Sequence, residues 1–550
     1  MTRGPARESY FFLMLRSRSV TSRTRRARLT GTAVITLAVA AATACSGQAV
    51  SKASGTAADS VQHGGAQAQT QSRVQTSIAW GTCPALAKDA IRDPREKCGT
   101  VTVPLDYQHP DGKTITVEVS KIATAKPGRK RGYLLLNPGG PALEGLDMPS
   151  TMAPALPASV LDSYDLIGFD PRGVGHSTPM SCGIDPSLPA AFPYPAADGS
   201  IQANVATARA TAAACARIGG ELQYFTTANT ARDMDRIREA LGVPEISYWG
   251  RSYGTYLGAV YTSLFPRHTG RMVLEGNVDP GDVWRGETEL WNQGMNDRFP
   301  DAARVAAAGN ATLGLGRTAA RVTSTFLSLA SRLDRKPAVV PGTHDAVSGA
   351  LLRVVTYELL LSNDTLTPLT RFWKAAADLA AGKSPTAADT DVLRQAFAAT
   401  AAEPGVPADN QSSMFMALTC GDVAWPRGTA TYAAATAADR ERYPLSDGMP
   451  GNIWPCAFWS KAPVEPPVQV TSKGPRDILL LQNRRDNATP LAGALGLRRA
   501  LGNRAAMVTA DSGGHYVYGV GSTCADQATV AFLAGGTLPA KDESCPAAAS

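Results

Sequence analysis

The pentapeptide Gly250-Arg251-Ser252-Tyr253-Gly254 restricts the fold of this chain more than any other feature. Residues 246–249 before it predict a short strand, and residues 256–265 after it predict a helix. The chain must turn sharply between the two, and a glycine on each side of the serine avoids collisions with neighbouring elements. The pattern predicts a serine hydroxyl presented above a sheet, at the start of a helix. A glycine-rich turn with an idle serine is the alternative.

Strand-like and helix-like segments alternate on both sides of this turn. Met234, Ile237 and Leu241 recur with helical spacing, and a last helix is expected near residues 527–533. Further strands are predicted at residues 101–103, 114–119, 132–136, 164–169, 271–274, 477–481 and 506–509, the first two as an antiparallel pair. Such alternation is typical of an α/β fold with a mostly parallel sheet and helices on both faces.

Between residues 284 and 463 the alternation stops, and Ala-rich helical stretches dominate. We therefore predict a helical cap at 284–463, inserted into one core formed by residues 76–283 and 464–550. The sequence has no zinc-ligand spacing and no phosphate-binding glycine loop, so no metal or cofactor is expected. It also has no basic stripe interleaved with aromatic residues, which argues against nucleic acid as a partner.

The N-terminal segment has the pattern of an export signal. A basic stretch at residues 23–28 precedes an uncharged apolar stretch at 29–44 that is short for a membrane span. Arg25-Arg26 resembles a twin-arginine motif, and an ordinary Sec signal is the alternative. We assign residues 1–44 to the signal. Residues 45–75, rich in Ser, Ala, Gln and Gly, are assigned to a flexible linker.

The cysteines also point to export. Of nine, Cys45 directly follows the apolar stretch, where bacterial lipoproteins carry their lipid. Ala42-Thr43-Ala44 also fits ordinary signal cleavage, so free secretion is the alternative. Neighbours in the sequence suggest four disulfides in an oxidising compartment, with buried thiols as the alternative: Cys83–Cys98, Cys182–Cys215, Cys420–Cys456 and Cys524–Cys545. We expect an extracellular protein, or one attached to the outer face of the cell membrane only through a lipid on Cys45.

A serine nucleophile needs a general base, and His515 is the candidate. After a nucleophile turn of this kind the order along the chain is serine, acid, histidine. His268 falls on the helix that leaves the turn, and His344 lies in the cap before any plausible acid. His515 follows the last predicted strand in a glycine-rich loop, which suits a catalytic base.

The acid of the triad is predicted to be Asp486. It is the only carboxylate in the loop at residues 483–490, after the strand that precedes the histidine strand. There it would accept the imidazole Nδ1–H and stabilise the imidazolium. Asp477 lies at the wrong end of that strand, and Asp511 is very close to His515 in sequence. Both remain alternatives.

Two backbone N–H groups should stabilise the oxyanion. One belongs to Tyr253, directly after the serine, and the other comes from the turn Asn137-Pro138-Gly139-Gly140-Pro141. Gly139 and Gly140 would let the backbone approach a substrate carbonyl. A simple Pro/Gly turn is the alternative.

Several segments together resemble the tripeptidyl aminopeptidase-like branch of the α/β hydrolases, which are relatives of the prolyl aminopeptidases. The resemblance covers roughly residues 80–546. The matching segments are the turn at 137–141, residues 169–177, 248–258 and 482–490, and Gly513-Gly514-His515.

The resemblance implies an α/β-hydrolase fold whose cap narrows the site to small or N-terminal peptide substrates. It also implies a secreted serine aminopeptidase, often a lipoprotein, that releases short peptides, expected to be tripeptides, through an acyl-enzyme. We expect a monomer. A carboxylesterase of the same fold and a non-catalytic peptide-binding lipoprotein are the alternatives.

Two positions depart from the family pattern. Ala142-Leu143-Glu144-Gly145 replaces further glycine after the Gly-Gly-Pro turn, and Arg251 replaces a usually small residue beside the nucleophile. Either change could shift specificity. An exopeptidase also needs a carboxylate for the substrate's amino group. The sequence offers Glu275, Glu287 and Asp422, with Asp279 and Glu289 as further candidates, and does not choose among them.

Overall fold

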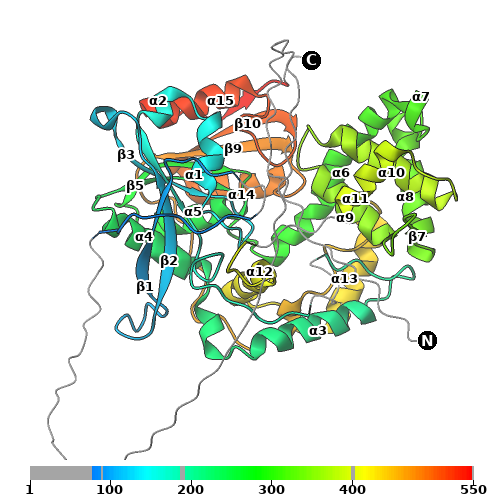
Figure 1. The fold of residues 1–550 in the computed structure, drawn as a ribbon, viewed down its shortest axis with the longest axis horizontal. Helices are drawn as coiled ribbons and strands as arrows, with labels where there is room; N and C mark the ends of the chain where they lie inside the picture. Colours follow the sequence, from blue (N-terminus) through cyan, green and yellow to red (C-terminus); the bar gives the residue numbers. More distant parts are fainter. Residues whose placement is uncertain (1–76, 88–90, 186–191, 398–402, 548–550) are drawn as a thin grey trace, which may run out of the picture. The chain divides into compact units, whose positions relative to one another are not determined.

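The computed structural model describes residues 77–87, 91–185, 192–397 and 403–547. A nine-stranded sheet with strand order β1-β2-β4-β3-β5-β6-β9-β10-β11 organises the fold (Figure 1). β1 pairs with β2, and β2 with β4, in antiparallel fashion, and the remaining neighbours are parallel. The α/β-hydrolase fold expected from the sequence is confirmed.

The predicted strands and helices occur close to their expected positions. The sheet consists of β1 (Lys97–Pro104), β2 (Thr114–Ile122), β3 (Gly132–Asn137), β4 (Tyr164–Phe169), β5 (Ile246–Arg251), β6 (Thr269–Glu275), β9 (Ile478–Arg485), β10 (Ala505–Gly513) and β11 (Glu543–Cys545). Its helices are α1 (Met148–Met152), α2 (Ala158–Leu161), α4 (Thr227–Ala240), α5 (Tyr253–Leu264), α14 (Leu491–Leu501) and α15 (Thr523–Val530). The sequence analysis did not predict β11, which is short and polar at its start.

The central strands are buried on both faces, which explains their nearly continuous apolar sequences. Successive residues of one strand enter different clusters. Leu135, Tyr248 and Leu480 pack with α4, α5 and α14, whereas Leu136 and Leu481 pack with α1, α2 and α15. The two clusters fix the register of the sheet, because a slip of one residue would exchange the faces.

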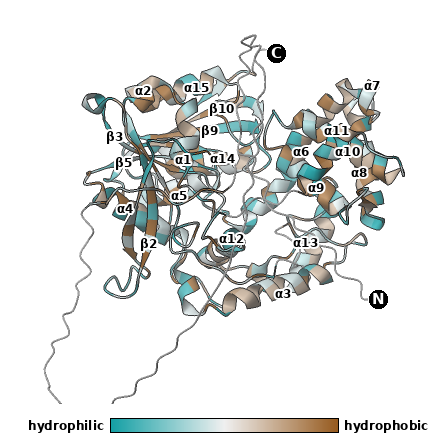
Figure 2. Ribbon diagram, viewed as in Figure 1, coloured by the Kyte–Doolittle hydropathy of each residue, from teal (hydrophilic) through white to brown (hydrophobic). Residues whose placement is uncertain are grey.

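A helical region is inserted between β6 and β9, as predicted. It contains α6 (Arg285–Ala308), α7 (Asn310–Leu313), α8 (Ala319–Arg335), α9 (Gly349–Leu359), α10 (Leu366–Ala380), α11 (Ala387–Ala396), α12 (Asn410–Asp422) and α13 (Thr429–Arg442). A small antiparallel pair, β7 (Ala338–Val339) and β8 (Ala346–Val347), interrupts the helices. Helices α6 and α8–α11 surround an apolar cluster of their own, and Figure 2 shows hydrophobic and hydrophilic residues mixed along them. α12 instead joins the core cluster that contains α4 and α5.

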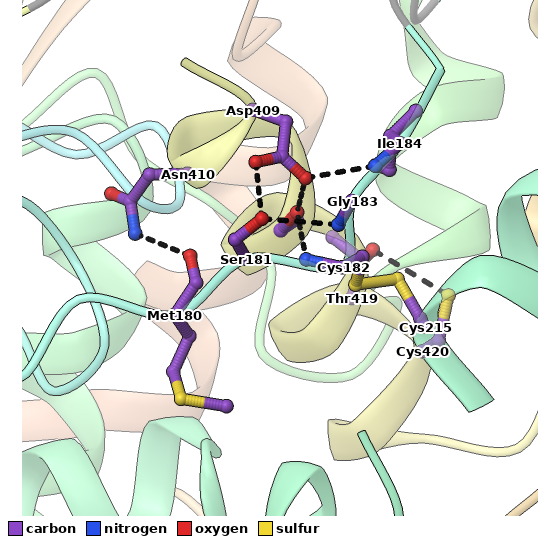
Figure 3. Close-up of a disulfide and its surroundings, with 11 residues drawn as sticks. Met180, Ser181, Cys182, Gly183, Ile184, Cys215, Asp409, Asn410, Thr419 and Cys420 are labelled. Carbon is purple, nitrogen blue, oxygen red and sulfur yellow. Dashed lines mark hydrogen bonds between the residues drawn. A yellow bond between two sulfur atoms is a disulfide. The ribbon is translucent and has the colours of Figure 1, made fainter. Parts of the chain in front are cut away.

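Helix α3 (Gln202–Ala216) lies between β4 and α4 in the chain, and the sequence analysis did not predict it. The segment before it is fixed to the start of α12 (Figure 3). Asp409 accepts hydrogen bonds from the Ser181 hydroxyl and from the Ile184 N–H, and the Asn410 side chain donates to the Met180 carbonyl. The Cys182–Cys215 disulfide joins this segment to α3.

The described residues contain four disulfides: Cys83–Cys98, Cys182–Cys215, Cys420–Cys456 and Cys524–Cys545. They are the pairs suggested by neighbours in the sequence, and they indicate an extracellular protein. The expected signal at 1–44, the linker at 45–75 and Cys45 lie outside the described residues. Among the helices that the structure describes, none combines the length and apolar character needed to cross a membrane.

Candidate active site

Ser252 lies in a strained turn between β5 and α5. Its φ is 55° and its ψ is −125°, a conformation that a residue with a side chain rarely adopts. Gly139 packs against this turn, since a Cβ there would lie 2.3 Å from the Arg251 carbonyl oxygen and 2.9 Å from the Ser252 Cβ. A Cβ on Gly250 would meet the Gly254 carbonyl oxygen at 2.3 Å. The glycines therefore make the sharp turn possible, as the sequence predicted.

The end of β6 contacts both Ser252 and His515. The Ser252 N–H donates to the Glu275 carbonyl over 2.9 Å. Gly276, which follows, has a φ of +69°, and a Cβ there would lie 3.1 Å from His515 Cε1. β5, β6, β9 and β10 are successive parallel neighbours, so their carboxyl ends meet at one edge of the sheet. The fold thus brings the predicted serine, acid and histidine to the same edge.

Asp486 and His515 form a buried pair at this edge. His515 Nδ1 lies 2.9 Å from Asp486 Oδ2, and the two residues are 3% and 1% exposed. Asp486 also accepts from the N–H groups of Ala488 and Thr489 and from the Thr489 hydroxyl. These donors fix the carboxylate so that it can orient the imidazole.

The other acids and histidines of the sequence analysis lie elsewhere. Asp511 forms an ion pair with Arg485, and Asp477 lies near Arg504 below the start of β9. His268 follows the end of α5 rather than lying on it, and pairs with Asp235. His344 is an exposed residue between β7 and β8. Among the described residues, none of the four forms a hydrogen bond or an ion pair with Asp486 or His515.

The candidates for stabilising the oxyanion are not equivalent. The Gly139 N–H donates to Asn137 Oδ1 over 3.0 Å, so it is not free for a substrate oxygen. Tyr253 is the first residue of α5, where a backbone N–H has no acceptor within the helix. Gly140 has a φ of +112°, so a side chain at this position would be strained.

The inserted region contacts the loops of the acid and the histidine. The His515 N–H donates to the Leu361 carbonyl, between α9 and α10, over 2.8 Å. The Trp291 indole donates to the Ala488 carbonyl, and the Asn487 side chain donates to the Tyr357 carbonyl. Phe192, from the segment before α3, packs on both Trp291 and Tyr357. Phe192, Trp291 and Tyr357 therefore form an aromatic cluster beside the acid loop at residues 483–490.

Two of the carboxylates suggested for the substrate's amino group, Glu275 and Asp422, already have several hydrogen-bond partners inside the protein. Glu275 is fully buried and already accepts four hydrogen bonds from the protein. Asp422 accepts from the N–H and the hydroxyl of Thr227, at the start of α4, and from the Trp284 indole. Burial raises the pKa of Asp422 to about 6. Sequence alone could not reveal these internal partners.

Glu287 differs, and Glu358 is a candidate that the sequence analysis missed. Each is about 5% exposed or less, and neither has a cationic partner among the described residues. Burial, and then the nearby Asp486 carboxylate, raise the pKa of Glu287 well above its usual value. Burial raises the pKa of Glu358 to about 8, and its Oε2 has no hydrogen-bond partner within the part of the chain that the structure describes. A glutamate among the apolar residues of the α9 sequence was the only available signal.

Comparisons with known proteins identify the family of this chain. Residues 446–545 match the family model described as TAP-like protein. A tripeptidyl aminopeptidase from Streptomyces lividans is 34% identical over 490 residues, covering 86% of this chain and 87% of that protein. Carboxylesterase B from Mycobacterium tuberculosis H37Rv is 31% identical, covering 85% and 89%. Serine protease Hip1 from the same strain is 27% identical, covering 88% and 93%. The chain therefore belongs to the tripeptidyl aminopeptidase-like family of serine hydrolases.

Proposed function

We propose that this protein is a secreted serine aminopeptidase that releases short peptides, tripeptides above all, from the N-termini of peptides or proteins. The observation that carries the proposal is the buried Asp486–His515 pair beside the strained Ser252 turn. The similarity of the whole chain to the tripeptidyl aminopeptidase from Streptomyces lividans supports peptides as the substrate class. Lipidation of Cys45 would keep the enzyme at the outer face of the membrane.

In the proposed mechanism, His515 accepts the Ser252 proton as the hydroxyl oxygen attacks the peptide carbonyl. The N–H groups of Tyr253 and Gly140 stabilise the oxyanion, and Asp486 stabilises the imidazolium. The imidazolium then protonates the leaving amine, which departs with the C-terminal part of the substrate. The N-terminal peptide remains as an ester on Ser252. Water, activated by His515, hydrolyses this ester and regenerates the hydroxyl.

Glu287 and Glu358 are proposed to receive the substrate's free ammonium group. A buried carboxyl without a cation favours its neutral form, which agrees with the raised pKa of both groups. Burial, and then the charges of both groups, raise the pKa of Tyr357, which belongs to the aromatic cluster beside the acid loop. An entering ammonium would supply the missing partner, and peptides without a free N-terminus would lack it.

Paired chromogenic tripeptide substrates test the proposal. One has a free N-terminus and the other is acetylated, and both are assayed with the wild type and with Ser252→Ala. Cleavage of the free peptide only, abolished in the variant, is the expected result. Equal cleavage of both peptides would contradict an aminopeptidase and would indicate an endopeptidase.

Glu358→Gln is expected to raise KM for the free peptide by about 10- to 100-fold, because a hydrogen bond to a charged group contributes about 1.5–3 kcal/mol. Glutamine resembles the neutral carboxyl that burial favours, so the fold should be retained. Steady-state kinetics with the two peptides measure the effect. Glu289→Gln, on an exposed glutamate of α6, is the matched control. An unchanged KM in Glu358→Gln would remove this residue from the substrate site.

A carboxylesterase is the second candidate function, because the chain is 31% identical to carboxylesterase B. The same serine, histidine and acid cleave esters and amides. Turnover of simple esters, with no cleavage of either peptide, would favour this alternative.

A further inference from the structure

Glu275 is a buried carboxylate that joins two parts of the site. Its Oε2 accepts from the Trp249 indole over 3.0 Å and from Arg251 Nε over 2.8 Å, both on β5. Its Oε1 accepts from the N–H groups of Val517 and Tyr518 over 2.7 and 2.8 Å. One carboxylate thus connects the strand that ends at the nucleophile with the segment that follows the histidine.

Arg251 compensates the buried charge of Glu275. The guanidinium is partly exposed and lies 4.7 Å from the centre of the Tyr516 ring, directly after His515. Burial alone would raise the pKa of Glu275, but Arg251 and the two backbone N–H donors outweigh it and hold the pKa below its usual value. The arginine that departs from the family pattern therefore has its matching carboxylate inside the protein.

The same residue also fixes the nucleophile through its main chain, since the Glu275 carbonyl accepts the Ser252 N–H. Its carbonyl holds the serine turn while its side chain holds the histidine segment. A displacement of about 1 Å between reacting groups can cost about 100-fold in rate. Glu275 therefore connects the turn of Ser252 with the segment that follows His515.

We propose that the Arg251–Glu275 ion pair is a positioning device that sets the placement of His515 relative to Ser252. The inference rests on the proposed catalytic roles of Ser252 and His515. Glu275 acts through Ser252 and the histidine segment and does not touch substrate. Arg251 keeps the carboxylate ionised, so that both backbone N–H groups remain bound to it.

The test is the rate at which a small alkyl fluorophosphonate phosphonylates Ser252, measured per folded molecule. Glu275→Gln is expected to lower the saturating rate constant by about 10- to 100-fold and to leave the half-saturating concentration within about threefold. Arg251→Lys retains the charge and should stay within about threefold of the wild type, whereas Arg251→Met should lose about 10-fold.

Asp233→Asn is the control, because Asp233 forms a buried ion pair with Arg172, and neither residue forms a hydrogen bond with Ser252 or His515 among the described residues. It should lower Tm without slowing phosphonylation of the folded protein. A wild-type rate in Glu275→Gln would overturn the inference. If that variant does not fold, a wild-type rate in Arg251→Met would do so. A wild type that the reagent does not label would instead overturn the proposed serine chemistry itself.

Discussion

Ser252→Ala is expected to lower kcat for a free tripeptide substrate by about 10⁴- to 10⁶-fold, which is the loss seen when a serine nucleophile is removed. Alanine keeps the small volume of the side chain, so Tm should change little. The remaining activity would come from substrate binding and the oxyanion N–H groups, which do not need the hydroxyl. Steady-state kinetics and labelling by a fluorophosphonate measure the two consequences.

Ser263→Ala serves as the control for this variant. Ser263 is near the end of the same helix, α5, and its hydroxyl donates to the Ala259 carbonyl. Its removal should leave kcat and labelling unchanged. Retention of labelling in Ser252→Ala would mean that another residue is the nucleophile.

Asp486→Asn is expected to lower kcat by about 10⁴-fold while the protein remains folded. The asparagine amide can donate to His515 Nδ1, which would place the ring proton on Nε2 and prevent that nitrogen from accepting the serine proton. The amide also cannot stabilise the imidazolium. The remaining side-chain oxygen can still accept from Ala488 and Thr489, whose N–H groups bind Asp486 Oδ1 in the wild type.

Asp511→Asn tests whether the effect belongs to Asp486 alone. Asp511 is close to His515 in sequence, but it pairs with Arg485 and is partly exposed. We expect less than a threefold change in kcat, because surface ion pairs contribute about 0–1 kcal/mol. A large loss in Asp511→Asn together with an active Asp486→Asn would reverse the assignment of the acid.

Local sequence patterns were sufficient to predict much of the fold of this protein. The turn around Ser252 was predictable because a strand, a serine between glycines and a helix are adjacent in the sequence. The central strands were predictable because they are buried on both faces and therefore apolar throughout. His515 and Asp486 were proposed from the chain order of serine, acid and histidine that accompanies such a turn, and the disulfide pairs followed from proximity along the chain.

Contacts between segments that are distant in the sequence became known only from the tertiary structure. Glu275 was a plausible partner for a substrate amine until folding placed it beside Arg251 and the segment after His515. Glu358 was one acidic residue among many until packing buried it, with no cationic partner in the described ranges of the chain. A hydrogen-bond partner or a buried charge depends on neighbours far away in sequence, whereas a turn or an apolar strand depends on residues beside it. The sequence therefore determined the fold and the candidate reactive groups, and the tertiary structure determined which carboxylates have partners inside the protein.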